Sequence, residues 1–210
     1  MILHSFFRSS AAWRVRIALA LKGVDATIIP CNFRHNAQRS RDYLSLNPQG
    51  LVPTLVIDGA PLTQSLAIIE YLDETRPEPH LLPLDPLNRA RVRAMAQVIA
   101  SDIHPINNLR VLNLLRQDFG ADEDAVAVWY RHWIDAGFAA LEAMVTDSDG
   151  RHCFGEAVTI ADICLIPQMY NARRYATDLT PYPKLVAIDA YLSATPAFAD
   201  TAPEGQPDAV

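Results

Sequence analysis

The 210-residue sequence has few cysteines, and their spacing fits neither a disulfide framework nor a zinc site. Cys31, Cys153 and Cys164 are odd in number and include no CxxC pair. Six histidines are scattered without HxxxH or HExxH spacing, so we expect no metal site. The sequence also contains no GxGxxG, P-loop or GxSxG, which argues against nucleotide binding and serine hydrolase chemistry. Reduced, structural thiols in a cytoplasmic protein fit this cysteine usage.

Long apolar runs and an excess of positive charge are also missing. The longest apolar stretches end within about a dozen residues, too short to cross a bilayer. Met1 leads straight into a strand-like run, and we see no secretory signal. The formal net charge of −6 disfavours binding to nucleic acid or to an anionic membrane. We therefore expect neither partner, and any anionic ligand must be held by local arginines or backbone dipoles.

Residues 1–76 show the patterns of short strands alternating with helices. The expected elements are a strand at ILHSF, a helix over 10–22, a β-rich segment over 26–33, a helix over 38–46, a hairpin over 52–63 and a helix from residue 65. Gly23 is a good residue to end the first helix, and Asp58-Gly59 is a turn signal for the hairpin. The order βαβαββα predicts a small mixed sheet with helices on its faces.

A proline-rich stretch, PEPHLLPLDP at residues 77–86, predicts a stiff linker between two domains. After it the periodicity is helical to about residue 195, with an interruption at Pro105 and no convincing strand. The final segment, TAPEGQPDAV, predicts a loose tail. The expected parts are a first domain over 1–78, a linker over 79–86 and an all-helical domain over 87–210.

Polar residues gather at two predicted strand-to-helix junctions. Ser9 and Ser10 stand at the start of the first helix, with Arg8 just outside it. Gln64 and Ser65 stand at the start of the last helix of the first domain. Because the first amides of a helix have no intrahelical acceptor, both junctions favour an anion. Taken alone, the second junction is better explained as a plain N-cap.

Other residues have both a structural and a functional interpretation. Pro53, in LVPTL, either begins an edge strand or follows a cis peptide bond after Val52, and because only about one X-Pro bond in twenty is cis, the residues alone favour trans. His104 beside Asp102 and Asn108 is typical of a hydrogen-bonded interior histidine rather than a general base. These motifs are weak when taken singly, and their order along the chain carries more information.

Two further motifs lie in the helical half. Thr159 and Asp162, in TIAD, predict a capping box that starts a buried helix. Arg173 and Arg174 stand in the last turns of a predicted helix, where stabilisation of the helix dipole is the ordinary explanation.

The stretch RSSAAWRVRIALALKG resembles the signature of the zeta-class glutathione transferases, usually written SSCxWRVRIAL. From Leu3 to about Pro196, further segments resemble the same class: NPQGLVPTL, QSLAIIEYLDETRP, LLPLDP, DIHPINNLRVL, VTIADICLIPQ and ARRYATDLTPYP. The resemblance implies the two-domain architecture of glutathione transferases, with a thioredoxin-like α/β domain before an all-α domain, and a homodimer. The chain departs from the class signature at the cysteine position, where it has Ala11, so no mechanism can use a protein thiol at this position.

The resemblance also implies that glutathione is the cofactor, and it suggests the residues around it. Ser9 and Ser10 match serines beside the glutathione sulfur, where they would favour the thiolate. The residues expected to contact glutathione are Ser9, Ser10, Val52, Pro53 (after a cis bond), Gln64, Ser65, Asp102, His104 and Asn108. Arg8, Arg110 and Arg174 match arginines that would hold substrate carboxylates, although Arg110 could equally be a surface residue. The expected catalytic residues are Ser9, Ser10, Arg8 and Arg174.

The activity that the resemblance implies is the glutathione-dependent cis-trans isomerisation of maleylacetoacetate to fumarylacetoacetate, in tyrosine and phenylalanine catabolism. On this hypothesis the thiolate adds to the cis double bond, the resulting single bond rotates, and glutathione leaves. The expected partner is therefore a small cis-enone diacid. Three alternatives stay open: a maleylpyruvate isomerase of aromatic degradation, a transferase acting on electrophiles or α-haloacids, and a non-catalytic scaffold.

Overall fold

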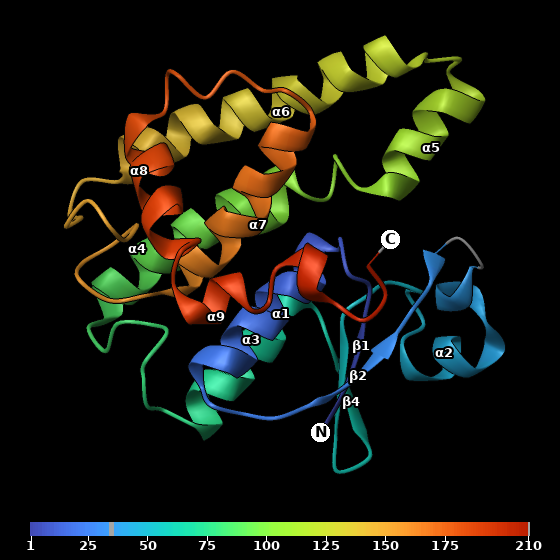
Figure 1. Ribbon diagram of the computed structural model, residues 1–210, viewed down its shortest axis with the longest axis horizontal. Helices are drawn as coiled ribbons and strands as arrows, with labels where there is room; N and C mark the ends of the chain where they lie inside the picture. The colour runs from blue at the N-terminus through green and yellow to red at the C-terminus, as the bar shows by residue number, and fades with distance from the viewer. Residues whose placement is uncertain (34–35, 210) are drawn as a thin grey trace. The chain divides into compact units, whose positions relative to one another are not determined.

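A computed structural model describes residues 1–33 and 36–209 of the chain. The described chain divides into two compact units, shown in Figure 1. The first unit comprises residues 1–81 and 194–210, and the second unit comprises residues 82–193. Each unit contains its own buried apolar side chains.

The division differs in one respect from the expected domains. The break after Leu81 falls inside the segment expected as a linker, but residues 194–210 group with the first unit and not with the helical domain. Hydrogen bonds explain this grouping, because the Trp13 indole nitrogen donates to Thr201 Oγ1 at 3.0 Å. The tail that was expected to be loose contains two short helical elements, α9 (Pro196–Ala199) and η4 (Pro203–Gly205).

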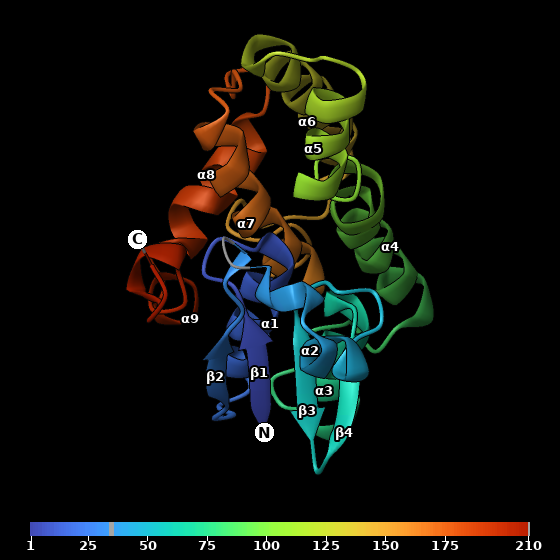
Figure 2. The ribbon, with the colours of Figure 1, turned by 90° about the vertical axis from the view of Figure 1, so that its right-hand side faces the viewer.

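The first unit is built on a four-stranded sheet in the order β2-β1-β3-β4 (Figure 2). Its strands are β1 (Ile2–Ser5), β2 (Thr27–Pro30), β3 (Thr54–Ile57) and β4 (Ala60–Thr63). β1 pairs in parallel with β2 and antiparallel with β3, and β3 and β4 form the expected hairpin. Asp58 and Gly59 turn the hairpin with φ of 50° and 84°, the positive values that a tight two-residue turn requires. The predicted mixed sheet is confirmed.

Helices cover both faces of this sheet, with α1 and α3 on one face and α2 on the other (Figures 1 and 2). The helical elements before residue 82 are α1 (Ser10–Leu21), η2 (Ala37–Arg39), α2 (Arg41–Leu46) and α3 (Ser65–Thr75). α1 packs against both α3 and α9. As predicted, α1 ends before Gly23, whose φ of 62° lies in the left-handed region that ends helices.

Lys22, directly after the end of α1, is a buried cation that the sequence did not predict. Lys22 Nζ donates to Asp73 Oδ1 at 2.7 Å and to the carbonyl oxygens of Arg76 and Pro79 at 2.7 and 2.6 Å. Asp73 Oδ1 also accepts from the Leu81 amide at 2.8 Å. Both charged side chains are buried, so removing one leaves the other uncompensated, at a cost of about 3–5 kcal/mol. This ion pair fixes the segment after α3 to the end of α1.

The second unit consists of helices apart from one isolated bridge between Ser148 and Gly155. Its elements are α4 (Pro86–Gln97), the π-helix η3 (Val98–Ile103), α5 (Leu109–Asp118), α6 (Glu123–Met144), α7 (Ile160–Arg174) and α8 (Pro183–Leu192). The predicted interruption at Pro105 is confirmed, because η3 ends two residues before it and α5 begins beyond it. At Gly137 of α6, a Cβ atom would lie 2.3 Å from Ile103 Cδ1, so any other residue would require the Ile103 side chain of η3 to shift.

α7 is the buried central helix of the second unit, and it packs against α4, η3 and α8. The predicted capping box forms at its start, where the Asp162 carboxylate accepts from the Thr159 amide at 2.8 Å. The same carboxylate accepts from the Cys153 amide at 2.6 Å. Burial raises the pKa of Asp162, against the effect of these hydrogen bonds. The box thus joins α7 to the loop that precedes it.

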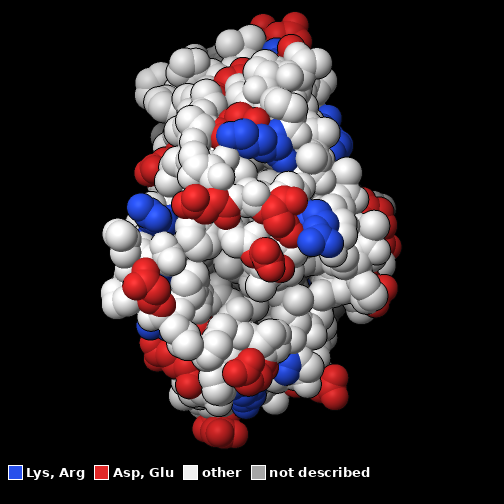
Figure 3. All heavy atoms as spheres, turned by 90° about the vertical axis from the view of Figure 1, so that its left-hand side faces the viewer, with Lys and Arg blue, Asp and Glu red and all other residues white. Residues whose placement is uncertain are grey.

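Two further observations concern the charged side chains on the surface and the apolar character of the helices. Figure 3 shows acidic and basic side chains interspersed on one face of the molecule. Among the described residues, no helix is both long enough and apolar enough to cross a membrane.

Candidate functional site

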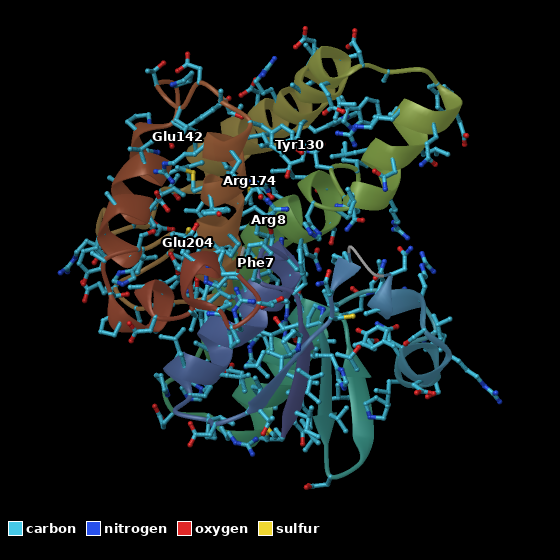
Figure 4. All side chains as sticks on the ribbon, turned by 45° about the vertical axis from the view of Figure 1, so that its right-hand side comes forward. Phe7, Arg8, Tyr130, Glu142, Arg174 and Glu204 are labelled. Carbon is cyan, nitrogen blue, oxygen red and sulfur yellow. The ribbon has the colours of Figure 1, made fainter. Side chains whose placement is uncertain are left out.

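The start of α1 brings Arg8, Ser9 and Ser10 together, as predicted. Ser9 is the N-cap, and its Oγ accepts from the Ala12 amide at 3.2 Å. Ser10 is the first helical residue and is buried, whereas Arg8 is exposed. The Arg8 guanidinium lies 5.1 Å from the centre of the Phe7 ring, and Figure 4 labels both residues. Two hydroxyls and one cation therefore stand at the positive end of a 12-residue helix.

The capping role of Ser9 leaves its hydroxyl able to bind an anion. A serine hydroxyl has one proton to donate and two lone pairs that accept. The Ala12 amide uses a lone pair of Ser9, so the hydroxyl proton can still be donated. The structural and functional interpretations of this residue are therefore compatible.

The start of α3 is a second junction with the predicted polar residues. Gln64 is exposed and has a φ of 69°, which is uncommon for a residue other than glycine. Such outliers gather at binding sites, where the surrounding structure holds them in place. Ser65 is buried, and its Oγ accepts from Arg14 at 3.3 Å. Arg14, a buried cation that the sequence did not indicate as part of a site, thus places positive charge behind this helix start.

The Val52–Pro53 peptide bond is cis, the second of the two alternatives considered for LVPTL. A second cis bond, Glu78–Pro79, was not predicted. Both Val52 and Pro53 are buried, directly before β3.

Hydrogen bonds from Tyr43 and Asn47 hold the segment just before Val52. The Tyr43 hydroxyl donates to the Leu51 carbonyl at 2.5 Å, and the Asn47 amide nitrogen donates to the same oxygen at 2.7 Å. The Tyr43 and Thr54 hydroxyls are also 2.9 Å apart. Burial raises the pKa of Tyr43, so its hydroxyl keeps its proton at neutral pH. Tyr43 therefore holds the residues on both sides of the Val52–Pro53 bond, Leu51 before it and Thr54 after it.

In the second unit, Arg174 lies on an aromatic support that was not predicted. Its guanidinium donates to Asn171 Oδ1 at 3.2 Å and lies 5.7 Å from the centre of the Tyr175 ring. Tyr175 in turn stacks on Tyr130, with ring centres 3.6 Å apart and planes 7° from parallel. Figure 4 labels Tyr130 and Arg174, which come from α6 and α7. The exposed guanidinium is thus oriented at the end of a helix, where a substrate carboxylate could pair with it.

The remaining predicted residues lie in one segment of the second unit. Asp102 is an exposed residue of η3, and His104 follows that element and is half-buried. Asn108 is the N-cap of α5, and its Oδ1 accepts from the Arg110 amide at 3.2 Å. The Arg110 side chain is exposed. The roles of these four residues toward a ligand stay predictions.

The three cysteines are buried. Burial raises the pKa of the Cys31 thiol to about 11 and that of Cys153 well above its usual range. Among the residues that the structure describes, no group of three or more His, Cys, Asp or Glu side chains is placed to hold a metal ion. The described site therefore offers helix starts, hydroxyls and guanidinium groups, which bind anions.

Comparisons with known proteins agree with this fold. Residues 8–75 match the family described as the glutathione S-transferase N-terminal domain. The probable maleylacetoacetate isomerase of Vibrio cholerae is 46% identical, covering 100% of this chain and 98% of the relative. The maleylpyruvate isomerase of a Ralstonia species is 47% identical, covering 99% of each chain.

Solved structures give the same result. The holo structure of a maleylpyruvate isomerase, described as a bacterial zeta-class glutathione transferase, matches with a TM-score of 0.97 and 46% identity over 100% of each chain. A maleylacetoacetate isomerase from Anaeromyxobacter dehalogenans, with glutathione bound in its active site, matches with a TM-score of 0.89 and 43% identity. That match covers 99% of this chain and 97% of the other. With relatives this similar over their full length, the chain belongs to the zeta class of the glutathione transferase family.

Proposed function

We propose that this protein is a glutathione-dependent isomerase that converts maleylacetoacetate to fumarylacetoacetate. The observation that carries the proposal is the start of α1, where Ser9, Ser10 and Arg8 stand together at the positive end of a helix. The relatives named above are isomerases of two such cis diacids, and one of them has glutathione in its active site.

The first unit has the polar groups that glutathione needs. The α3 start, with the Ser65 hydroxyl and the Arg14 guanidinium behind it, suits the γ-glutamyl carboxylate. The Val52 backbone, just before β3, suits pairing with the cysteinyl amide, as the resemblance to the zeta class implies. Ser9 and Ser10 suit the sulfur. Bound glutathione supplies a thiolate that adds reversibly to the cis double bond and so permits rotation about it.

The task of Ser9 and Ser10 is to keep a sulfur charged at neutral pH. A free thiol with a pKa near 8.5 is mostly protonated there. Lowering that pKa by about two units requires about 2.7 kcal/mol of preferential stabilisation of the thiolate. Hydrogen bonds to a charged group contribute about 1.5–3 kcal/mol each, and a helix N-terminus about 0.3–1 kcal/mol. The α1 start can therefore supply the required free energy.

Arginines are suited to the two carboxylates of the substrate. Arg8 stands beside the proposed thiolate position, and Arg174 is oriented by Asn171 and Tyr175. A guanidinium fork pairs with a carboxylate through two parallel hydrogen bonds. Arg110, which is exposed on α5, is a third candidate for the same role.

Maleylpyruvate is a second candidate substrate, with the same chemistry on a shorter keto-diacid. The observation that favours it is the resemblance to maleylpyruvate isomerases, one of which matches with a TM-score of 0.97. Because the two substrates share the cis double bond and two carboxylates, the residues named above serve both.

We also propose that the protein acts as a cytoplasmic homodimer, as its resemblance to the zeta class suggests. The three cysteines are buried and form no disulfide, which agrees with a reducing compartment. Sedimentation at equilibrium tests the dimer, which would have twice the 23.3 kDa mass of the chain.

The isomerase proposal is tested by initial rates of cis-to-trans conversion with and without glutathione, for both substrates. We expect turnover only with glutathione, a trans product without a glutathionyl group, and the higher kcat/KM with maleylacetoacetate. Equal rates with and without glutathione would dismiss the proposal. A product that retains the glutathionyl group would show a conjugating transferase instead.

A further inference from the structure

The C-terminal segment, residues 194–210, reaches the loop between β1 and α1. Figure 1 shows its red ribbon lying against the blue α1, and α9 contacts α1. Trp13 and Arg16 of α1 both donate to Thr201, to its hydroxyl at 3.0 Å and to its carbonyl oxygen at 3.1 Å respectively. The segment is therefore attached to the helix whose first residues form the proposed site.

Asp208 lies at the end of this segment and binds the loop directly. Its Oδ2 accepts from the Phe7 amide at 3.1 Å. The Phe7 carbonyl oxygen accepts from Arg16 at 2.9 Å, and Arg16 also donates to Ser5 Oγ at 3.0 Å. Burial lowers the pKa of Arg16 to about 10, and the negative charge of Asp208 acts in the opposite direction. The backbone of Phe7 is thus held on both sides, by Asp208 at its nitrogen and by Arg16 at its oxygen.

Phe7 in turn supports the site residues that follow it. Its ring lies 5.1 Å beneath the Arg8 guanidinium, and both residues are labelled in Figure 4. Ser9 is tied to the same loop, because its amide donates to the Phe6 carbonyl oxygen at 2.9 Å. A displacement of Phe7 would therefore move the cation and the capping serine together.

We propose that Asp208 is a positioning residue, which acts with Arg16 through the Phe7 backbone to hold Arg8 and Ser9 in place for the isomerisation. The inference rests on the proposed function for its catalytic readout. It assigns a role in turnover to the last residues of the chain, which no motif marked. Removing the carboxylate should loosen the loop without removing any group that touches glutathione or substrate.

The test compares Asp208→Ala with Asp200→Ala, which removes an exposed carboxylate from the same segment. For Asp208→Ala we expect kcat to fall about tenfold while the dissociation constant of glutathione changes by less than about twofold. Amide hydrogen exchange at Phe7 should be faster than in the wild type. Asp208→Asn, which keeps an oxygen acceptor for Phe7 but removes the charge near Arg16, should lie between the wild type and Asp208→Ala. Asp200→Ala should behave as the wild type.

Two results would overturn the inference. One is equal kcat and equal Phe7 exchange in Asp208→Ala and Asp200→Ala. The other is a loss of glutathione affinity that matches the loss of kcat, since that result shows a general structural defect. If the wild-type protein does not isomerise either substrate, the proposed function fails. In that case, only amide hydrogen exchange at Phe7 tests whether Asp208 holds the loop in place.

Discussion

The two units of the molecule present their anion-binding groups in different ways. In the first unit, Ser9 and Ser65 stand at helix starts, where short side chains and backbone amides are fixed by the fold. In the second unit, Arg174 is a long, exposed side chain at a helix end, oriented by Asn171 and by contact with Tyr175. The first arrangement suits one unchanging ligand, such as glutathione. The second presents an exposed guanidinium, which suits a carboxylate of the proposed diacid substrate.

The comparison predicts that changes in the two units alter different constants. The largest effect is expected for Ser9→Ala/Ser10→Ala, which should lower kcat about 75-fold at pH 6, because the thiolate fraction falls from about 0.24 to about 0.003 when the thiol pKa rises from about 6.5 to about 8.5. Steady-state kinetics at saturating glutathione measures this effect. Ser40→Ala is the matched control, since Ser40 caps α2 by accepting from the Tyr43 amide at the same 3.2 Å. If Ser40→Ala lowers kcat as much, loss of a helix cap explains the effect and the serines have no special role.

Arg174→Ala should affect the substrate and leave glutathione binding unchanged. Loss of one charged hydrogen-bonding group predicts a fall in kcat/KM for the diacid of about 30-fold, or about 2 kcal/mol. Calorimetric titration should give an unchanged glutathione affinity. Arg91→Ala, which removes an exposed arginine of α4, is the control. A collapse of glutathione binding in Arg174→Ala would remove the distinction between the two units.

Ser65→Ala should show the opposite pattern. We expect glutathione to bind about tenfold more weakly, because a hydroxyl donor at the α3 start is lost. The KM of the diacid at saturating glutathione should stay the same. An unchanged glutathione affinity would show that the α3 start does not hold the γ-glutamyl carboxylate, and that Ser65 serves mainly as the partner of Arg14.

The smallest effect concerns stability at alkaline pH. The pKa of Cys31 is raised from 9.0 to about 11 in the folded chain, so its contribution is complete below pH 9 and is lost as the pH rises toward 11. At pH 10 this loss amounts to about 1.4 kcal/mol for one group. Urea unfolding at pH 7 and pH 10 should show a smaller difference between the two pH values for Cys31→Ala than for the wild type. Equal differences would show that other buried groups, such as Cys153, determine the alkaline loss.

Local sequence patterns predicted much of the fold because their causes are local. Gly23 ends α1, Asp58-Gly59 turns the hairpin, and Thr159 and Asp162 form the capping box. The residues alone favour a trans bond before Pro53, which is wrong, and only the family resemblance indicates the observed cis bond.

What the sequence did not reveal depends on partners far away along the chain. Arg16 looked like part of an apolar helix, yet it is buried and bonded to Thr201, which lies near the other end of the chain. The tail was expected to be loose because its composition is that of a loop, but Asp208 meets Phe7. The aromatic support of Arg174 comes from Tyr130 and Tyr175, which lie on separate elements. No local pattern reports such contacts.

The most direct test of the account is an ultraviolet titration of the glutathione thiol bound to the protein. The thiols of Cys31 and Cys153 do not interfere near neutral pH, since burial raises their pKa values, and the protein without glutathione serves as the blank for the remaining absorbance. We predict that the bound thiol titrates about two pH units below the value of about 8.5 for a free thiol, and that Ser9→Ala/Ser10→Ala restores that value. A bound thiol that titrates near 8.5 in the wild type, or a lowered pKa that survives loss of both serines, would contradict the account.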